Sequence, residues 1–121
     1  MDDDHRPIVG LVGPCKAGKT LLKRGLSSLG YPIKHIAQEH SYVQDMWQKI
    51  AKPDILIYLD VSFPVTLKRS SLHWHKGEYE EQLRRLTHAR EHADLIIYTD
   101  DLTPQQVLAQ ALEYISTMKK D

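Results

Sequence analysis

Four apolar runs along the chain predict the strands of a sheet. Residues 8–12 form a short apolar run that ends at a glycine, residues 33–37 form a weaker one, and residues 95–98 form another. The strongest run is Ile-Leu-Ile-Tyr-Leu at residues 55–59. Its continuous hydrophobicity indicates burial on both faces, as in a parallel sheet.

Segments with helical spacing of apolar residues separate these runs. Residues 19–29 carry leucines on one face, and Gly30 just beyond them is a typical helix C-cap. A second helix is expected after Ser41 as its cap, with Pro53 ending it. Its predicted apolar face consists of Val43, Met46, Trp47 and Ile50.

Three further helices are expected in the second half of the chain. One follows Pro64, and one spans residues 78–93 with an apolar stripe. The last helix begins with a capping box, in which Thr103 is the cap and Gln106 its partner. The members of the predicted stripe in residues 78–93 are Tyr79, Leu83, Leu86 and Ala93.

Strands that alternate with helices predict an α/β protein. We expect one domain over residues 1–121, a three-layer α/β/α sandwich around a parallel sheet of about four strands. Ligands of such sheets bind at the carboxyl ends of the strands. Four residues should therefore share one rim of the sheet: Gly13, Glu39, Asp60 and Asp100.

Composition narrows the functional classes. Sixteen basic and sixteen acidic residues cancel, which argues against a nucleic-acid partner or a membrane partner. The chain has no apolar run of about 18 residues, and its start at residues 1–4 is acidic, unlike a secretory signal. A single cysteine, Cys15, cannot form an internal disulfide. These features favour a cytoplasmic protein.

A phosphate-binding motif links the first run to the first helix. The sequence GPCKAGKT fits G-x-x-x-x-G-K-[ST] at every fixed position and lies between a strand and a helix. Such a loop turns backbone N–H groups toward phosphate, its lysine reaches the β- and γ-phosphates, and its hydroxyl can hold Mg²⁺. The residues expected at a nucleoside triphosphate are Gly13, Pro14, Cys15, Lys16, Ala17, Gly18, Lys19, Thr20 and Leu21.

Two residues of this loop have alternative interpretations. Lys16 either adds positive charge at the phosphates or points to solvent. Cys15 is either a redox-sensitive thiol, favoured by nearby lysines and a helix N-terminus, or a passive small residue.

Three stretches together resemble the nucleoside and nucleotide kinases among P-loop NTPases, the group of thymidylate kinase and the deoxynucleoside kinases. They are the phosphate loop, residues 53–61 (PDILIYLDV) and residues 93–100 (ADLIIYTD). The resemblance implies ATP or another nucleoside triphosphate, Mg²⁺, and phosphoryl transfer to a small acceptor. It also implies that the loop at Asp100 lies against the base.

Two carboxylates are alternatives for the metal ligand beside Thr20. Glu39 resembles the Glu of the Glu-Arg-Ser sequence in deoxynucleoside kinases, and Asp60 ends a hydrophobic strand as a Walker-B acid does. Catalysis of phosphoryl transfer also needs cations at the transferring group. Lys19, Arg69 and Arg90 are the candidates, and both arginines are alternatively surface or packing residues.

The chain is much shorter than these kinases. Little sequence lies between Gly30 and Ser41, where the family holds its acceptor, and His40 replaces an arginine. The acceptor is therefore unusual, held across a homodimer interface, or absent. In the last case the protein is a nucleotide-binding module, either a slow NTPase or a regulatory switch.

Residues 88–92 match the zinc motif H-x-x-E-H. Helical geometry turns both of its histidines away from the apolar stripe, toward solvent, and no third ligand can be assigned. We therefore expect no zinc site there.

Overall fold

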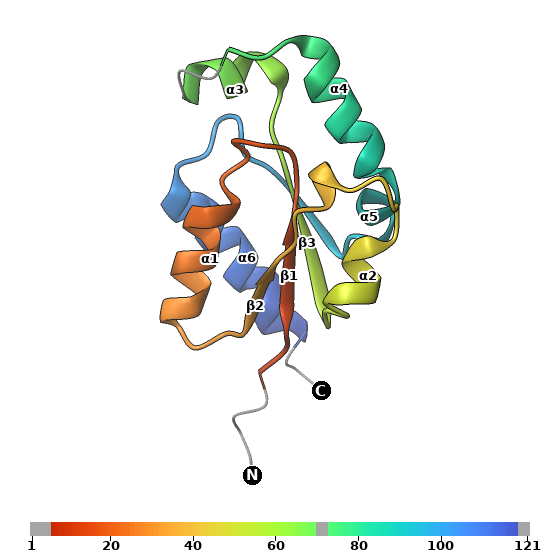
Figure 1. Ribbon diagram of the computed structural model, residues 1–121. Helices are drawn as coiled ribbons and strands as arrows, with labels where there is room; N and C mark the ends of the chain where they lie inside the picture. The colour runs from red at the N-terminus through yellow and green to blue at the C-terminus, as the bar shows by residue number, and fades with distance from the viewer. Residues whose placement is uncertain (1–5, 70–72, 119–121) are drawn as a thin grey trace.

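One parallel sheet organises the computed structural model, which describes residues 6–69 and 73–118 (Figure 1). In this part of the chain the sheet has four strands in the order β2-β1-β3-β4. The α/β class and the strand number predicted from the sequence are confirmed. The strands are β1 (Val9–Val12), β2 (Ile33–His35), β3 (Ile55–Asp60) and β4 (Leu95–Tyr98).

The central strand β3 is buried on both faces, as its sequence predicts. Its residues 55–59 are at most 2 % exposed, and it pairs with β1 and with β4. Two aspartates fix the strand starts, because Asp54 accepts a hydrogen bond from the backbone of Ile8 and Asp94 accepts one from Leu56. Both bonds cross to a neighbouring strand and therefore help to set the register.

Helices cover both faces of the sheet. Ile55, Ile57 and Leu59 face a core shared with α1 (Lys19–Ser28) and α6 (Pro104–Met118). Leu56 and Tyr58 face a second core with α2 (Met46–Ile50) and α5 (Thr87–His92). This arrangement is compatible with three layers. Figure 1 shows α3 (Phe63–Arg69) and α4 (Lys76–Arg85) beyond the carboxyl ends of the strands.

The ends of α1 and α6 follow the predicted capping chemistry. Gly30 lies just past α1 with φ of 92°, in the left-handed region that glycine tolerates. The Thr103 hydroxyl accepts from the Gln106 backbone, and the Gln106 side chain accepts from the Thr103 backbone. The predicted capping box is therefore confirmed.

The predicted start of the helix after Ser41 is wrong. A short 3₁₀ helix, η1 (Gln38–His40), precedes this residue, and α2 begins only at Met46. The Ser41 hydroxyl accepts from the Val43 backbone at 3.1 Å and forms a local turn instead of a cap. The Gln38 side chain accepts from the Trp47 backbone at 2.8 Å and so caps α2.

The apolar face predicted for that helix is only partly buried. Trp47 is 6 % exposed, but Ile50 is 69 % exposed and Val43 lies outside the helix at 41 %. Five residues make little more than one turn, so a single large side chain can anchor the helix.

The helix expected over residues 78–93 is two helices. α4 ends at Arg85, Leu86 is the junction, and α5 begins at Thr87. The Leu86 side chain is fully buried in the second core, against Leu56 and Tyr58. The chain therefore turns at Leu86 and continues along that face of the sheet. Two further buried residues are absent from the predicted stripe: Gln82 on the buried side of α4, and Ala89 in α5.

The same change moves one histidine of the H-x-x-E-H motif out of solvent. His88 is half-buried, and its Nδ1 accepts a hydrogen bond from Trp47 Nε1 at 3.1 Å. His92 is exposed, as predicted. Within residues 6–69 and 73–118, neither histidine joins a group of three metal-ligating side chains. None of the helices in these residues has the length and apolar character needed to cross a membrane.

Candidate functional site

The loop between β1 and α1 has backbone angles that require its two motif glycines. Gly13 has φ of 154°, and a Cβ added there would lie 2.3 Å from the carbonyl oxygen of Leu59. Gly18 has φ of 103° and is the N-cap of α1. Lys16 also has positive φ, at 69°. The loop therefore bends sharply against β3 and enters the helix through Gly18.

The start of α1 leaves backbone donors free for an anion. The Leu22 N–H donates to the carbonyl of the N-cap residue Gly18 at 3.1 Å. The N–H groups of residues 19–21 lie before it and have no carbonyl in a preceding turn. With the positive end of the helix dipole, they form an environment suited to phosphate.

Lys19 lies inside the loop and is held by two oxygen atoms. Its side chain is 6 % exposed. Its Nζ donates to the Gly13 carbonyl and to Oε2 of Glu39, the latter at 2.7 Å. The ammonium group is thus fixed beneath the loop, at the carboxyl ends of β1 and β2.

Glu39 reaches the loop from η1, directly after β2. Its side chain is also 6 % exposed. One carboxylate oxygen, Oε2, binds Lys19, while Oε1 is buried and has no hydrogen-bond partner among the described residues. An unpartnered buried carboxylate oxygen is costly, so this atom is suited to a cation or a water.

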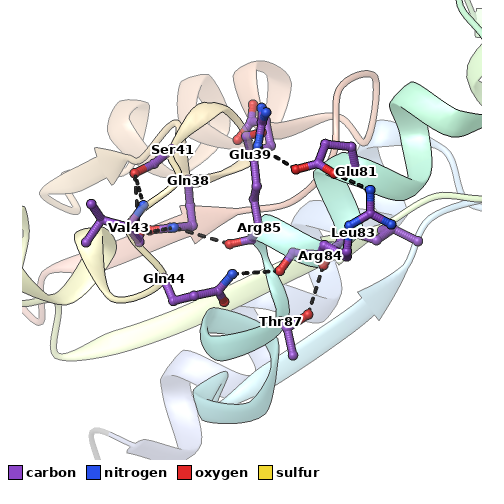
Figure 2. A network of polar contacts seen from close by, with 10 residues as sticks. All are labelled: Gln38, Glu39, Ser41, Val43, Gln44, Glu81, Leu83, Arg84, Arg85 and Thr87. Carbon is purple, nitrogen blue, oxygen red and sulfur yellow. Dashed lines mark hydrogen bonds and ion pairs between the residues drawn. The ribbon is translucent and has the colours of Figure 1, made fainter.

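A network between η1 and α4 fixes the backbone around Glu39 (Figure 2). Gln38 donates to the Arg85 carbonyl at 3.2 Å, and Gln44 donates to the Arg84 carbonyl at 2.9 Å. The Arg85 side chain donates to the Glu39 carbonyl at 3.4 Å. The position of the carboxylate thus depends on α4 as well as on β2.

These groups open into a cavity of about 630 Å³. It contains five of the predicted polar site residues, and its apolar wall comes from α1, α6 and the loop after β4. The predicted residues on its lining are Cys15, Lys16, Ala17, Gly18, Lys19, Thr20, Leu21, Glu39 and Arg69. The lining residues that the sequence analysis did not single out are Leu22, His35, Thr99, Leu102, Pro104 and Val107. Gly13 and Pro14 lie in the same loop but do not line the cavity.

Arg69 connects the loop to the end of β4. Its guanidinium donates to the Lys16 carbonyl at 2.9 Å and to Oγ1 of Thr99 at 3.1 Å. It therefore stands beside the cavity with a defined orientation, at the end of α3.

The other predicted arginine and two predicted carboxylates lie away from the cavity lining. Arg90 is 3.5 Å from Asp60 and lies over the ring of Tyr58. Burial opposes the charged form of Arg90, but Asp60, Tyr58 and Tyr98 together more than offset this, and the pKa of Arg90 is raised. Asp100 accepts from the Ser62 backbone at 2.9 Å. Asp60 is thus an ion-pair partner, and Asp100 ties two loops together.

Gln82 is a loop contact that the sequence analysis missed. Its side chain is buried in α4, where Oε1 accepts from the Cys15 backbone at 3.0 Å and Nε2 donates to Cys15 Sγ at 3.1 Å. Its only sequence signal is its spacing of three residues from Tyr79 on the buried side of α4.

His35 is a second missed residue, at the end of β2. It lines the cavity, and its pKa is lowered by burial and by the nearby charge of Lys19. The imidazole is therefore biased toward the neutral form beside the loop.

Comparison with known families and proteins gives no relative on which to base an assignment. No model of a known protein family matches the chain, and no curated protein matches it.

Proposed function

We propose that this chain is an ATP- and Mg²⁺-dependent phosphotransferase of the nucleoside or nucleotide kinase kind, with a P-loop NTPase fold. It binds a nucleoside triphosphate at residues 13–20 and transfers a phosphoryl group to a small acceptor. One observation carries the proposal: Lys19, Thr20 and Glu39 line one cavity at the N-terminus of α1.

Phosphate binding has the strongest support. The cavity combines backbone donors at the start of α1 with a buried ammonium group. The Gly13 carbonyl and Glu39 accept hydrogen bonds from that ammonium group. A triphosphate would offer it oxygens of higher charge, so Lys19 has its binding position prepared in advance.

The residues present fit a magnesium ion. Mg²⁺ prefers oxygen ligands, and Glu39 has a buried oxygen that no group in residues 6–69 and 73–118 contacts by a hydrogen bond. Thr20 and Glu39 would hold the ion, and it would neutralise negative charge on the phosphates. Asp60 fits this role less well, because it does not line the cavity.

The remaining wall of the cavity suits a base. Its apolar lining residues include Leu21 of α1, Leu102 of the loop after β4 and Pro104 of α6. The volume of about 630 Å³ is within the usual range of roughly 300–1,000 Å³ for small-molecule sites. Arg69 stands between this wall and the loop, where it would add positive charge near the phosphates.

The alternative is a nucleotide-binding module, a slow NTPase or a switch, without an acceptor. The short connection after β2 favours it. Residues 36–45 contain only the η1 turn, and Gln38 and Gln44 tie this segment to α4. A segment held in this way offers little chain for an acceptor site of its own.

Calorimetric titration with ATP, GTP and ADP, with and without Mg²⁺, tests the binding step. An assay of ADP release against a panel of nucleosides and nucleotides then tests transfer. A rise in ADP release with one acceptor supports the phosphotransferase, whereas binding without such a rise supports the module. Absence of binding overturns both proposals. Lys49→Ala is a matched lysine control, because Lys49 is an exposed residue of α2.

A further inference from the structure

Three side chains with different ligand atoms converge beside the phosphate loop. Cys15 comes from the loop, and Glu39 and His40 come from η1. One ligand atom from each lies within 4.8 Å of the other two. Cys15 Sγ is 3.9 Å from Nε2 of His40, which is 3.8 Å from Oε2 of Glu39.

The unpartnered oxygen of Glu39 is independent support for a ligand here. The Glu39 side chain is more than nine-tenths buried, and its Oε1 has no hydrogen-bond partner among the described residues. Lys19 occupies the other oxygen. The carboxylate therefore has one binding position left for a cation.

The donor set differs from the one magnesium prefers. Zinc-class ions bind thiolate at about 2.3 Å and imidazole or carboxylate at about 2.0–2.2 Å in tetrahedral sites. Ligand atoms in such a site are roughly 3.3–3.7 Å apart. The separations of 3.9 Å and 3.8 Å are slightly longer than this, and the three ligand atoms all lie within 4.8 Å of one another. Because the 3.8 Å separation is to Oε2, the oxygen that Lys19 binds, the site closes through side-chain movements that turn Oε1 of Glu39 toward His40 and Cys15. Magnesium, in contrast, selects oxygen ligands.

We propose that Cys15, Glu39 and His40 form a binding site for a thiophilic divalent cation of the zinc class. Water completes the fourth position. On binding, the Cys15 thiol releases its proton to solvent and the sulfur forms the metal bond. Gln82 Nε2, 3.1 Å from Sγ, donates to the sulfur and holds it in position.

Occupancy of this site competes with the magnesium-bound nucleotide, because both use Glu39. This consequence rests on the proposed function, whereas the metal site itself does not. A zinc-class ion would then reduce nucleotide binding and act as an inhibitor.

Cobalt is the probe for the site, because tetrahedral Co²⁺ bound to thiolate has a near-ultraviolet charge-transfer band. The full chain, reduced and without nucleotide, is titrated with Co²⁺ and separately with Zn²⁺ in a calorimeter. We expect one equivalent of either metal to bind per chain, and the Co²⁺ complex to show the charge-transfer band in its absorption spectrum. Cys15→Ser should abolish the band, and His40→Gln should weaken binding at least tenfold. His92→Gln, a matched change at an exposed histidine of the H-x-x-E-H motif, should leave both unchanged.

Absence of the band, or its persistence in Cys15→Ser, overturns the proposed site. A separate ATP titration with added Zn²⁺ tests the competition. Zinc should weaken ATP binding at least tenfold in the natural protein and much less in His40→Gln; equal affinity with and without zinc overturns the competition. If the protein shows the cobalt band but binds no ATP, the proposed metal site is supported and the proposed function is overturned.

Discussion

The ammonium nitrogen of Lys19 lies 2.7 Å from Oε2 of Glu39, 20 positions away in the sequence, and both side chains are 6 % exposed. A buried ion pair is weak evidence for stability, because desolvation offsets most of its attraction. The proposed function accounts for the pair in another way, because it assigns Lys19 to the phosphates of a nucleoside triphosphate and Glu39 to its magnesium ion.

Removal of one partner should destabilise the fold more than removal of both. Lys19→Met leaves a buried carboxylate uncompensated, which costs about 3–5 kcal/mol. The double variant Lys19→Met/Glu39→Gln should recover part of this loss. Urea unfolding of the two single variants, the double variant and the natural protein measures the coupling. A double variant that loses the sum of the single losses would show that the pair is not coupled.

Variants of the two candidate metal ligands, Glu39 and Asp60, should differ in how strongly Mg²⁺ affects their affinity for ATP. Glu39→Gln should weaken the effect of Mg²⁺ on ATP affinity at least tenfold, because it removes the only carboxylate on the lining of the cavity within the described residues. Asp60→Asn should leave that dependence nearly unchanged, since Asp60 pairs with Arg90 away from the cavity lining. ATP titrations over a series of Mg²⁺ concentrations measure both effects, and the reverse order would assign the metal to Asp60.

Two glycine-to-alanine changes should have opposite signs. Gly13→Ala places a methyl group 2.3 Å from the Leu59 carbonyl at a positive φ, which should cost about 2 kcal/mol or more. Gly77→Ala adds a methyl group with no atom within 4 Å inside α4, so it should stabilise by up to about 0.5–1 kcal/mol. Urea midpoints measure both, and an equally stable Gly13→Ala variant would contradict the loop geometry.

Tyr58 should make the protein sensitive to high pH. Burial raises its pKa from 10.0 to about 12, so between these values the folded state keeps a proton that the unfolded state has lost. The free energy of unfolding should therefore fall by about 1.4 kcal/mol per pH unit across this window. Tyr58→Phe should remove this contribution to the slope, whereas Tyr42→Phe, at an 82 % exposed residue, should not. Equal slopes in both variants would contradict the burial of the hydroxyl group.

Local chemistry explains which elements could be predicted from the sequence. The continuous apolar run of β3 and the capping pair Thr103 and Gln106 each contain their own signal, and both agree with the structure. The glycines of the loop were also predictable from the local sequence. At Gly13 a positive φ and the nearby Leu59 carbonyl leave no room for another residue.

Features that depend on distant partners could not be predicted in this way. The cap of α2 comes from Gln38, which precedes Ser41 and reaches across a turn. The helix breaks at Leu86 because this side chain is buried in the core against Leu56 and Tyr58. The helical spacing of apolar residues in the sequence carries no information about that core. The contact of Gln82 with Cys15 joins residues 67 positions apart; the spacing of Gln82 from Tyr79 indicates its burial but does not identify this partner.

Titration of the natural protein and of Lys19→Ala with Mg²⁺-ATP in a calorimeter tests the central claim most directly. Because Lys19 is buried and paired, the fold of the variant is first verified by circular dichroism and urea unfolding. We predict micromolar binding to the natural protein and a loss of at least about 100-fold, or roughly 2.7 kcal/mol, in the variant. Absence of binding to the natural protein, or equal affinity in a folded variant, would contradict a triphosphate site at residues 13–20.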